Sequence, residues 1–447
     1  MRIGLIPALL SIGLAGPFEE IEGQTSSPDL RIGQDVHVSA PAATVPHIEP
    51  HLAIHPSDPE RLVVAARVVP PEADAPLLRV YGSADGGRTW TAGQLARGDR
   101  AGDDPWLAYS PDGALHLLSL PGALRTSRDD GLTWGPPEPL PQGDDNPYDY
   151  PKLVVEPGTG AIYLWSAQTR DAPWGTRIGA AVLLRSLGGQ APFETPRPVF
   201  VGDLDLQVGA PAILPDGALV APLHELGHDQ AFLESPRLWV VRFEKGGSGP
   251  TGPFLVSEDF LADSPDAAVD ASGGLHHGRV YLAWLQVSAD RQTWNQYVSH
   301  SDDRGTTWSS PQPIYAGAPS APSYVPHHPE IAVDGRGRVA LTWQEPREGP
   351  GERCFALVVA LSADGGATYT APAQVADVES CNDTPANRVG LTSAPDSRSV
   401  VHRFGDGGDY HGLVGRPDGG FSVVWADSRT GVYQLWSAAV GVIDGNH

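Results

Sequence analysis

Basic residues and long apolar runs are both scarce in this sequence. Lysine and arginine together number 30 against 54 aspartates and glutamates, so the formal charge is −24 at pH 7. A chain this acidic repels nucleic acids and anionic membranes, so neither is expected as a partner. An acidic sugar would need a local basic pocket. After the N-terminus no apolar run approaches the roughly 20 residues that span a bilayer, and we expect no membrane insertion.

Cysteine is almost absent as well. Cys354 and Cys381 are the only two, and their spacing matches no zinc motif. In an exported chain they can form one disulfide between late elements of the fold, and two reduced thiols are the alternative. Export is expected because residues 1–15 resemble a signal peptide with a small-x-small cleavage site. We therefore expect a secreted or periplasmic protein.

The sequence also lacks the long apolar period of amphipathic helices. Glycine and proline are abundant instead, at 52 and 44 residues, and 40% of the chain is hydrophobic. Many short strands separated by turns produce this composition. The sequence therefore predicts an all-β fold with an ample core.

One short pattern occurs four times. Its frame is Ser-x-Asp-x-Gly-x-x-aromatic, and each copy follows a short apolar run. The Asp side chain can cap backbone N–H groups, the glycine supplies an unusual φ, and the aromatic ring can fill a neighbouring core, so each copy predicts a tight hairpin. The copies are SADGGRTW from Ser83, SRDDGLTW from Ser127, SDDRGTTW from Ser301 and SADGGATY from Ser362.

This frame resembles the Asp-box, or BNR repeat, of the sialidase superfamily. In that family it marks the turn between the outer strands of β-propeller blades, on the face away from the active site. The resemblance implies a β-propeller and a glycan as substrate, most specifically an exo-α-sialidase-type glycoside hydrolase. It implies no required cofactor.

A second repeat counts the blades. It has a proline followed by apolar residues, and a second apolar run comes some ten residues later. Seven such pairs at a mean period of about 60 residues predict seven blades, with six as the alternative because sialidases usually have six. The residues before the proline are Glu49, Asp104, Tyr150, Ala210, Ser264 and His328, with Tyr410 in a copy that lacks proline.

Ring closure is predicted to use the N-terminus. Blade seven ends at about Val442, one strand short, and the strand-like stretch 34–38 lies before blade one. We therefore expect residues 16–46 to include a strand that completes the last blade, and residues 47–447 to form a single propeller domain. A monomer is expected.

The pre-proline residues predict a functional site. The innermost strand of each blade begins at one rim of the central channel, so these residues form one ring. Histidines, acids and Lys152 flank them, and arginines follow the second strands on the same face. The resulting candidates for substrate binding are Glu49, Arg67, Tyr150, Arg170, His328, Arg347 and Arg429.

The sialidase resemblance assigns roles to several of these residues. Three arginines grip the substrate carboxylate in sialidases, which implies Arg170, Arg347 and Arg429 here. A tyrosine acts as nucleophile, which implies Tyr410, with Glu330 or Glu345 as its base. Asp104 or Asp149 would be the acid.

Several alternatives stay open. The Arg-Ile-Pro motif of sialidases is replaced by Arg-Ile-Gly at positions 31–33, and each arginine could simply pin its loop through Glu345 or Asp427. A non-catalytic propeller could bind glycans or proteins through the same ring of residues at the channel rim. Histidines at 47, 51, 224, 228, 327 and 328, together with Tyr and Arg, leave open a lyase on uronate polysaccharides. No metal motif is present, although Ca²⁺ near Asp103, Asp104 and Asp149 is left open.

Overall fold

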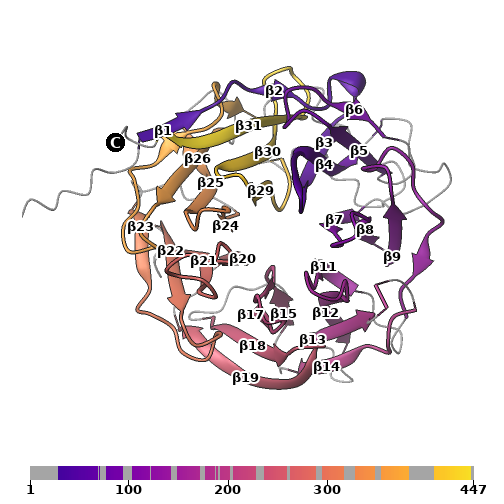
Figure 1. The fold of residues 1–447 in the computed structure, drawn as a ribbon, viewed down its shortest axis with the longest axis vertical. Helices are drawn as coiled ribbons and strands as arrows, with labels where there is room; N and C mark the ends of the chain where they lie inside the picture. The colour runs from indigo at the N-terminus through magenta and orange to yellow at the C-terminus, as the bar shows by residue number, and fades with distance from the viewer. Residues whose placement is uncertain are drawn as a thin grey trace, which may run out of the picture.

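Seven antiparallel sheets surround one central axis in the computed structural model (Figure 1). The model describes residues 29–443 except 69, 71–76, 94–102, 121, 142–147, 172–176, 187, 190–191, 202–204, 228–235, 259–261, 288–293, 317–327, 348–353 and 382–406. The predicted seven-bladed, all-β propeller is confirmed, and the six-bladed alternative is wrong. The predicted signal peptide lies outside the described residues.

The first three blades each contain four strands, ordered from the axis outwards. Blade one has β3 (His47–His55), β4 (Asp58–Val68), β5 (Leu77–Ser83) and β6 (Thr91–Ala92). Blade two has β7 (Asp103–Tyr109), β8 (Leu115–Leu120), β9 (Ala123–Ser127) and β10 (Glu138–Pro139). Blade three has β11 (Tyr148–Val155), β12 (Ile162–Asp171), β13 (Arg177–Ser186) and β14 (Arg197–Val201).

The next three blades vary this plan slightly, because blades four and six each have a fifth short strand. Blade four has β15 (Asp205–Val208), β16 (Ala212–Ile213), β17 (Leu219–Gly227), β18 (Leu238–Glu244) and β19 (Ser248–Ser257). Blade five has β20 (Ala262–Val269), β21 (Val280–Val287), β22 (Trp294–Ser301) and β23 (Gln312–Ala316). Blade six has β24 (Glu330–Val333), β25 (Val339–Arg347), β26 (Cys354–Ser362), β27 (Ala373–Gln374) and β28 (Ser380–Cys381).

Blade seven joins the two ends of the chain. Its inner strands are β29 (Gly412–Gly415), β30 (Phe421–Asp427) and β31 (Gln434–Ile443), and its outer strand comes from the N-terminus. There β1 (Asp29–Ile32) and β2 (Val36–His37) both pair antiparallel with β31. Figure 1 shows β1 beside β31. The predicted closing strand is confirmed, and its longer part lies just before the stretch 34–38.

The four repeated frames form identical hairpins between the third and fourth strands of their blades. In blade one the Asp85 carboxylate accepts the Thr89 N–H at 2.9 Å, and the Ser83 hydroxyl accepts the Gly87 N–H at 2.9 Å. The Trp90 ring packs against the core between blades seven and one. The predicted capping by aspartate is therefore confirmed. The same contacts recur in the frames beginning at Ser127, Ser301 and Ser362.

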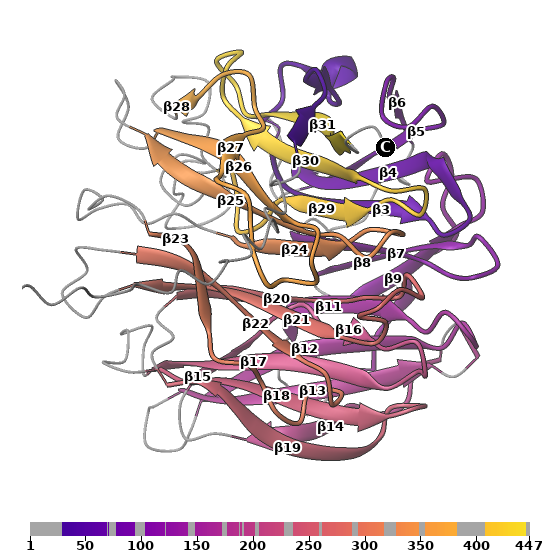
Figure 2. The ribbon, with the colours of Figure 1, turned by 60° about the vertical axis from the view of Figure 1, so that its left-hand side comes forward.

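The hydrophobic core is divided among the interfaces between neighbouring blades. The tryptophans that end four of the second apolar runs, Trp165, Trp284, Trp343 and Trp425, are fully buried there. Each buries about 150–250 Å² of surface, which makes aromatic residues the largest contributors to such a core. Figure 2 shows the blades from the side as successive layers of strands. Among the described residues no helix is long and apolar enough to cross a membrane.

Cys354 and Cys381 form a disulfide, as predicted. It joins β26 to β28 within blade six, where the two residues are register partners, rather than linking two blades. Cys381 directly precedes residues 382–406 in the sequence.

Replacing both cysteines by serine is expected to lower the free energy of unfolding by about 3–4 kcal/mol. The closed loop has a sequence separation of 27 residues, and loop-closure entropy for that length gives this value. Urea unfolding of the wild type and the double variant measures it. An unchanged midpoint, with reductant also without effect on the wild type, would contradict the prediction.

Candidate active site at the propeller axis

The innermost strands bend sharply where they reach the axis. Glu49, Asp104, Tyr150 and His328 have φ values of 54°, 47°, 50° and 64°. Left-handed backbone is uncommon for residues other than glycine and concentrates at functional sites. Each of the four precedes a proline. Four of the seven positions predicted from the proline pattern therefore have left-handed backbone.

Register shifts in the same strands accompany these bends. In blade three the shift falls between Asp149 and Lys152, and in blade two between Asp103 and Trp106. A bulge of this kind redirects side chains, and bulges are common next to active sites. Here the residue after the proline also reaches the axis. These residues are His51, Trp106, Lys152, Asp266 and Glu330.

Lys152 is the central cation of this cluster. Its ammonium lies 4.1 Å from the ring centroid of Trp106, 5.0 Å from that of Tyr410 and 5.3 Å from that of Tyr150. Only 3% of the residue is exposed. Burial lowers the pKa of Lys152, and four surrounding carboxylates oppose this shift. They are Glu330, Asp104, Asp266 and Asp409.

Asp266 and Glu330 form a hydrogen-bonded carboxyl pair. Asp266 Oδ2 also accepts the backbone N–H of Ile331 at 2.8 Å. Burial raises the pKa of Asp266 to about 7, although hydrogen bonds from Ile331 and Glu330 and the charge of Lys152 act to lower it. Two carboxyl groups can share a hydrogen bond only if one holds a proton. The pair can therefore supply an acid near neutral pH.

The tyrosines of the ring have different partners. Tyr410 is 4% exposed, and its hydroxyl donates to the carbonyl of Pro105 at 3.4 Å. Burial, together with the charges of Asp104 and Glu49, raises the pKa of Tyr410 well above its usual value, so the phenol is neutral. The Tyr150 hydroxyl donates to Asp409 Oδ2 at 2.7 Å.

Two further groups complete the cluster from blade one. Arg67 in β4 lies 3.6 Å from Glu49, and both side chains are buried. His51 Nδ1 accepts the Leu107 N–H at 3.1 Å, and its ring lies 3.9 Å from that of Trp106. Burial lowers the pKa of His51 to about 3, so this imidazole is neutral.

Glycine allows blades one and seven to meet closely. Gly408 has φ 119°, and a Cβ there would lie 2.5 Å from the backbone nitrogen of Glu49. A side chain at position 408 would therefore push Asp409 and Tyr410 away from the axis.

The cluster is tightly packed. The cavity enclosed by its side chains is about 10 Å³, which holds about one water molecule. A sugar ring does not fit among these side chains as they stand. Substrate contact with them therefore has to occur at the outer surface of the cluster or after side-chain movement.

Two of the arginines predicted to bind the substrate carboxylate already form ion pairs with acids of this chain. Arg347 lies 3.0 Å from Glu345 and 3.5 Å from Glu379. Arg429 lies 2.6 Å from Asp427, and it also pairs with Asp35 and Asp377. The loop-pinning ion pairs with Glu345 and Asp427 are thus present. The side chain of Arg170, in β12, lies outside the described residues.

His328 lines the same small cavity as the carboxyl pair. Asp149 is opposite Ala167 in the β11–β12 ladder, and its carbonyl accepts the Ser166 hydroxyl. Among the described residues, no group of three or more His, Cys, Asp or Glu side chains could hold a metal ion. The Ca²⁺ prediction, like the roles of Tyr410, Asp104 and Asp149, stays a prediction.

Raising the pH from 4 to 7 is expected to remove up to about 4 kcal/mol of stability through Asp266. Its folded pKa of about 7 lies above the ordinary 3.8. Its contribution is thus complete below pH 3.8 and lost as the pH rises through 7. His47 and His51, whose pKa burial lowers to about 3, act oppositely below pH 6.5. The difference in unfolding free energy between wild type and Asp266→Asn isolates the carboxyl, and a pH-independent difference would refute this.

Three solved structures of carbohydrate-active proteins are similar to this chain. No protein-family model and no curated protein matches the sequence. A PL25 ulvan lyase solved bound to -[GlcA(1-4)Rha3S]- is 11% identical with a TM-score of 0.50, over 91% of this chain and 96% of that one. The Hadza microbial sialidase Hz136 is 16% identical with a TM-score of 0.47, over 84% and 75%. An α-L-arabinofuranosidase of Fusarium graminearum is 12% identical with a TM-score of 0.44, over 92% and 98%. At these identities the likeness extends to the propeller fold alone.

Proposed function

We propose that this protein is a glycan-acting propeller with glycoside hydrolase activity at its axis. The observation that carries the proposal is the buried Asp266, hydrogen-bonded to Glu330, whose pKa is raised by burial to about 7. Glycoside hydrolysis needs such an acid to protonate the leaving oxygen. The resemblance of the four frames to sialidases supports a glycan as substrate, and the ulvan lyase with this fold is itself bound to a glycan fragment.

The cluster provides the groups for one hydrolytic step. The carboxyl pair donates its proton to the glycosidic oxygen as the bond from that oxygen to the sugar carbon breaks. Asp409, oriented by the Tyr150 hydroxyl at 2.7 Å, accepts a proton from the water that adds to the sugar carbon. Lys152 stabilises the carboxylates that remain ionised.

The local charge favours a neutral sugar. Carboxylates outnumber cations in the described part of the cluster, because Lys152 faces four acids and Arg67 already pairs with Glu49. An anionic sialic acid or uronate would be repelled there. A more specific alternative for the same site is exo-α-sialidase activity, with Tyr410 as nucleophile and Glu330 as its partner. The uronate lyase is disfavoured by the same charges.

A substrate panel tests the proposal. The purified mature protein is incubated with neutral oligosaccharides of arabinose, xylose, galactose and glucose, and with the 4-methylumbelliferyl glycoside of sialic acid. We expect new reducing ends from at least one neutral oligosaccharide and no release from the sialoside. Release from the sialoside that disappears in Tyr410→Phe would replace the neutral-sugar proposal by the sialidase alternative.

A second candidate is a glycan-binding propeller without turnover. The ion pairs of Arg347 and Arg429 with acids near their own loops favour it, because a catalytic grip would need these arginines to converge on the substrate. Binding of a neutral oligosaccharide in the same panel, with no product after prolonged incubation, would support this candidate over the hydrolase.

A further inference from the structure

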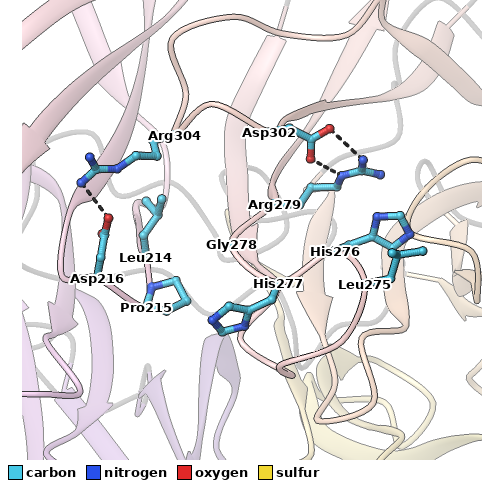
Figure 3. Close-up of a pocket in the computed structure, with 10 residues that line it drawn as sticks. All are labelled: Leu214, Pro215, Asp216, Leu275, His276, His277, Gly278, Arg279, Asp302 and Arg304. Atoms are coloured by element: carbon cyan, nitrogen blue, oxygen red, sulfur yellow. Dashed lines mark hydrogen bonds and ion pairs between the residues drawn. The ribbon is translucent and has the colours of Figure 1, made fainter.

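A larger pocket lies on the opposite face of the propeller, between blades four and five. Its volume is about 630 Å³, within the range of small-molecule sites. It is lined by the turns that follow the innermost strands of these blades and by Asp302 and Arg304 of the blade-five frame (Figure 3). None of the predicted site residues belongs to it.

One wall of the pocket is an insertion in the repeat. In blade six the turn after the innermost strand closes by a hydrogen bond from the Gly337 N–H to the Asp334 carbonyl. In blade five the equivalent bond runs from Gly278 to Asp270, so the chain between them is longer. Insertions confined to one repeat often form a binding face. At this loop Leu275 is 93% exposed.

The acidic groups of the pocket are fixed in orientation. Arg279 donates to both carboxylate oxygens of Asp302 at 2.7 and 2.8 Å, and Arg304 pairs with Asp216 at 2.8 Å. Both carboxylates remain more than half exposed, at 62% and 52%. Each carboxylate oxygen has a further lone pair, so these groups are pre-oriented acceptors with neutralised charge.

His277 supplies a donor beside them. Its Nδ1 accepts the Gly273 N–H at 3.1 Å, so the neutral ring carries its proton on Nε2. Figure 3 shows this ring directed toward Pro215 across the pocket. Apolar side chains also line the pocket: Pro215 near His277, and Leu275 beside His276 on the other side of the view in Figure 3.

From this arrangement we infer that the pocket is a second binding site, for one or two residues of a neutral oligosaccharide. Sugar hydroxyls both donate and accept hydrogen bonds, and the C–H face of a sugar ring packs on apolar side chains. Paired arginines and aspartates leave little net charge for an ionic ligand. The choice of a glycan rests on the proposed function. The site itself is separate from the axis, because the two cavities share no lining residue.

The test measures binding on an array of neutral oligosaccharides. Four full-length proteins are compared: the wild type, the double variant Leu275→Ser with His277→Ala, the control Leu132→Ser, and the axial variant Asp266→Asn. Leu132 is 44% exposed in the frame of blade two, so its replacement makes the same chemical change elsewhere on this face.

Loss of a hydrogen bond and an apolar contact is expected to weaken binding about tenfold or more in the double variant. Binding by the Leu132→Ser control is expected to match the wild type, whereas Asp266→Asn reports the share of binding that the axis contributes. Binding that is lost in Asp266→Asn and kept in the double variant would overturn the pocket while supporting the axial site. Absence of any oligosaccharide binding would overturn it too. Hydrolysis measured separately decides the proposed function.

Discussion

Replacing Lys152 by methionine is expected to destabilise the protein by about 3–5 kcal/mol. Methionine keeps the length of the stem, but it removes the ammonium that lies over the Trp106 ring and among four carboxylates. Those groups are largely enclosed, so their charges would be left without compensation. Urea unfolding at pH 7.5 measures the loss.

Lys245→Met is the matched control. Lys245 lies 3.4 Å from Glu156, but 60% of its side chain is exposed. Solvent screens such a pair, so the control should change stability by about 1 kcal/mol or less. Equal effects of the two substitutions would show that the carboxylates around Lys152 do not depend on it. A smaller loss for Lys152→Met at pH 4 than at pH 7.5 is also expected, because protonated acids need no counter-charge.

Asp266→Asn and Glu330→Gln are each expected to lower kcat on a natural oligosaccharide about 10²- to 10⁴-fold. Each substitution removes one carboxyl of the pair that holds the proton, while keeping the size of the side chain. On a 4-methylumbelliferyl glycoside of the same sugar the loss should be much smaller, because this leaving group departs without protonation. The ratio of the two losses identifies an acid.

A merely structural role would reduce both rates equally, so equal losses would contradict the assignment. Asp112→Asn serves as a control, since Asp112 lies on the opposite face in an exposed pair with Arg128. Its activity on both substrates should match the wild type. Circular dichroism of each variant checks that the propeller is intact.

Sequence periodicity predicted the fold because every blade has the same structural requirements. Every unit has to bury two faces of a sheet, so apolar runs, turns and the serine–aspartate frames recur at regular spacing. The hydrogen bonds of the frames show why the pattern recurs: in every copy the aspartate accepts a backbone N–H from the same threonine position, and the serine accepts one from the glycine. Ring closure followed from a last blade that was one strand short.

The sequence predicted some residues of the candidate site and missed others. The proline pattern located Glu49, Asp104, Tyr150 and His328, with Lys152 and Glu330 among the flanking residues, but it did not single out Trp106 or Asp266. Side chains two apart share a face of a strand, and that rule would have indicated both. Their pairing depends on the bulges and on packing from separate blades, which no local pattern encodes.

The arginines illustrate a different limit. Arg347 and Arg429 follow the second strands as predicted, yet acids from nearby loops already bind them, including Asp35 from the N-terminal segment. The sequence alone does not show which acid will pair with an arginine at the rim of the channel. The longer turn of blade five, by contrast, is visible in the sequence as an irregularity in the repeat. Only the structure shows the pocket beside it.

The pH dependence of kcat/KM on a neutral oligosaccharide tests the central claim most directly. If the Asp266–Glu330 pair is the acid, the rate should fall above an apparent pKa near 7, the value to which burial raises the pKa of Asp266. Turnover that stays constant from pH 6 to pH 9 would contradict the account. So would the absence of turnover on every neutral glycan in the panel.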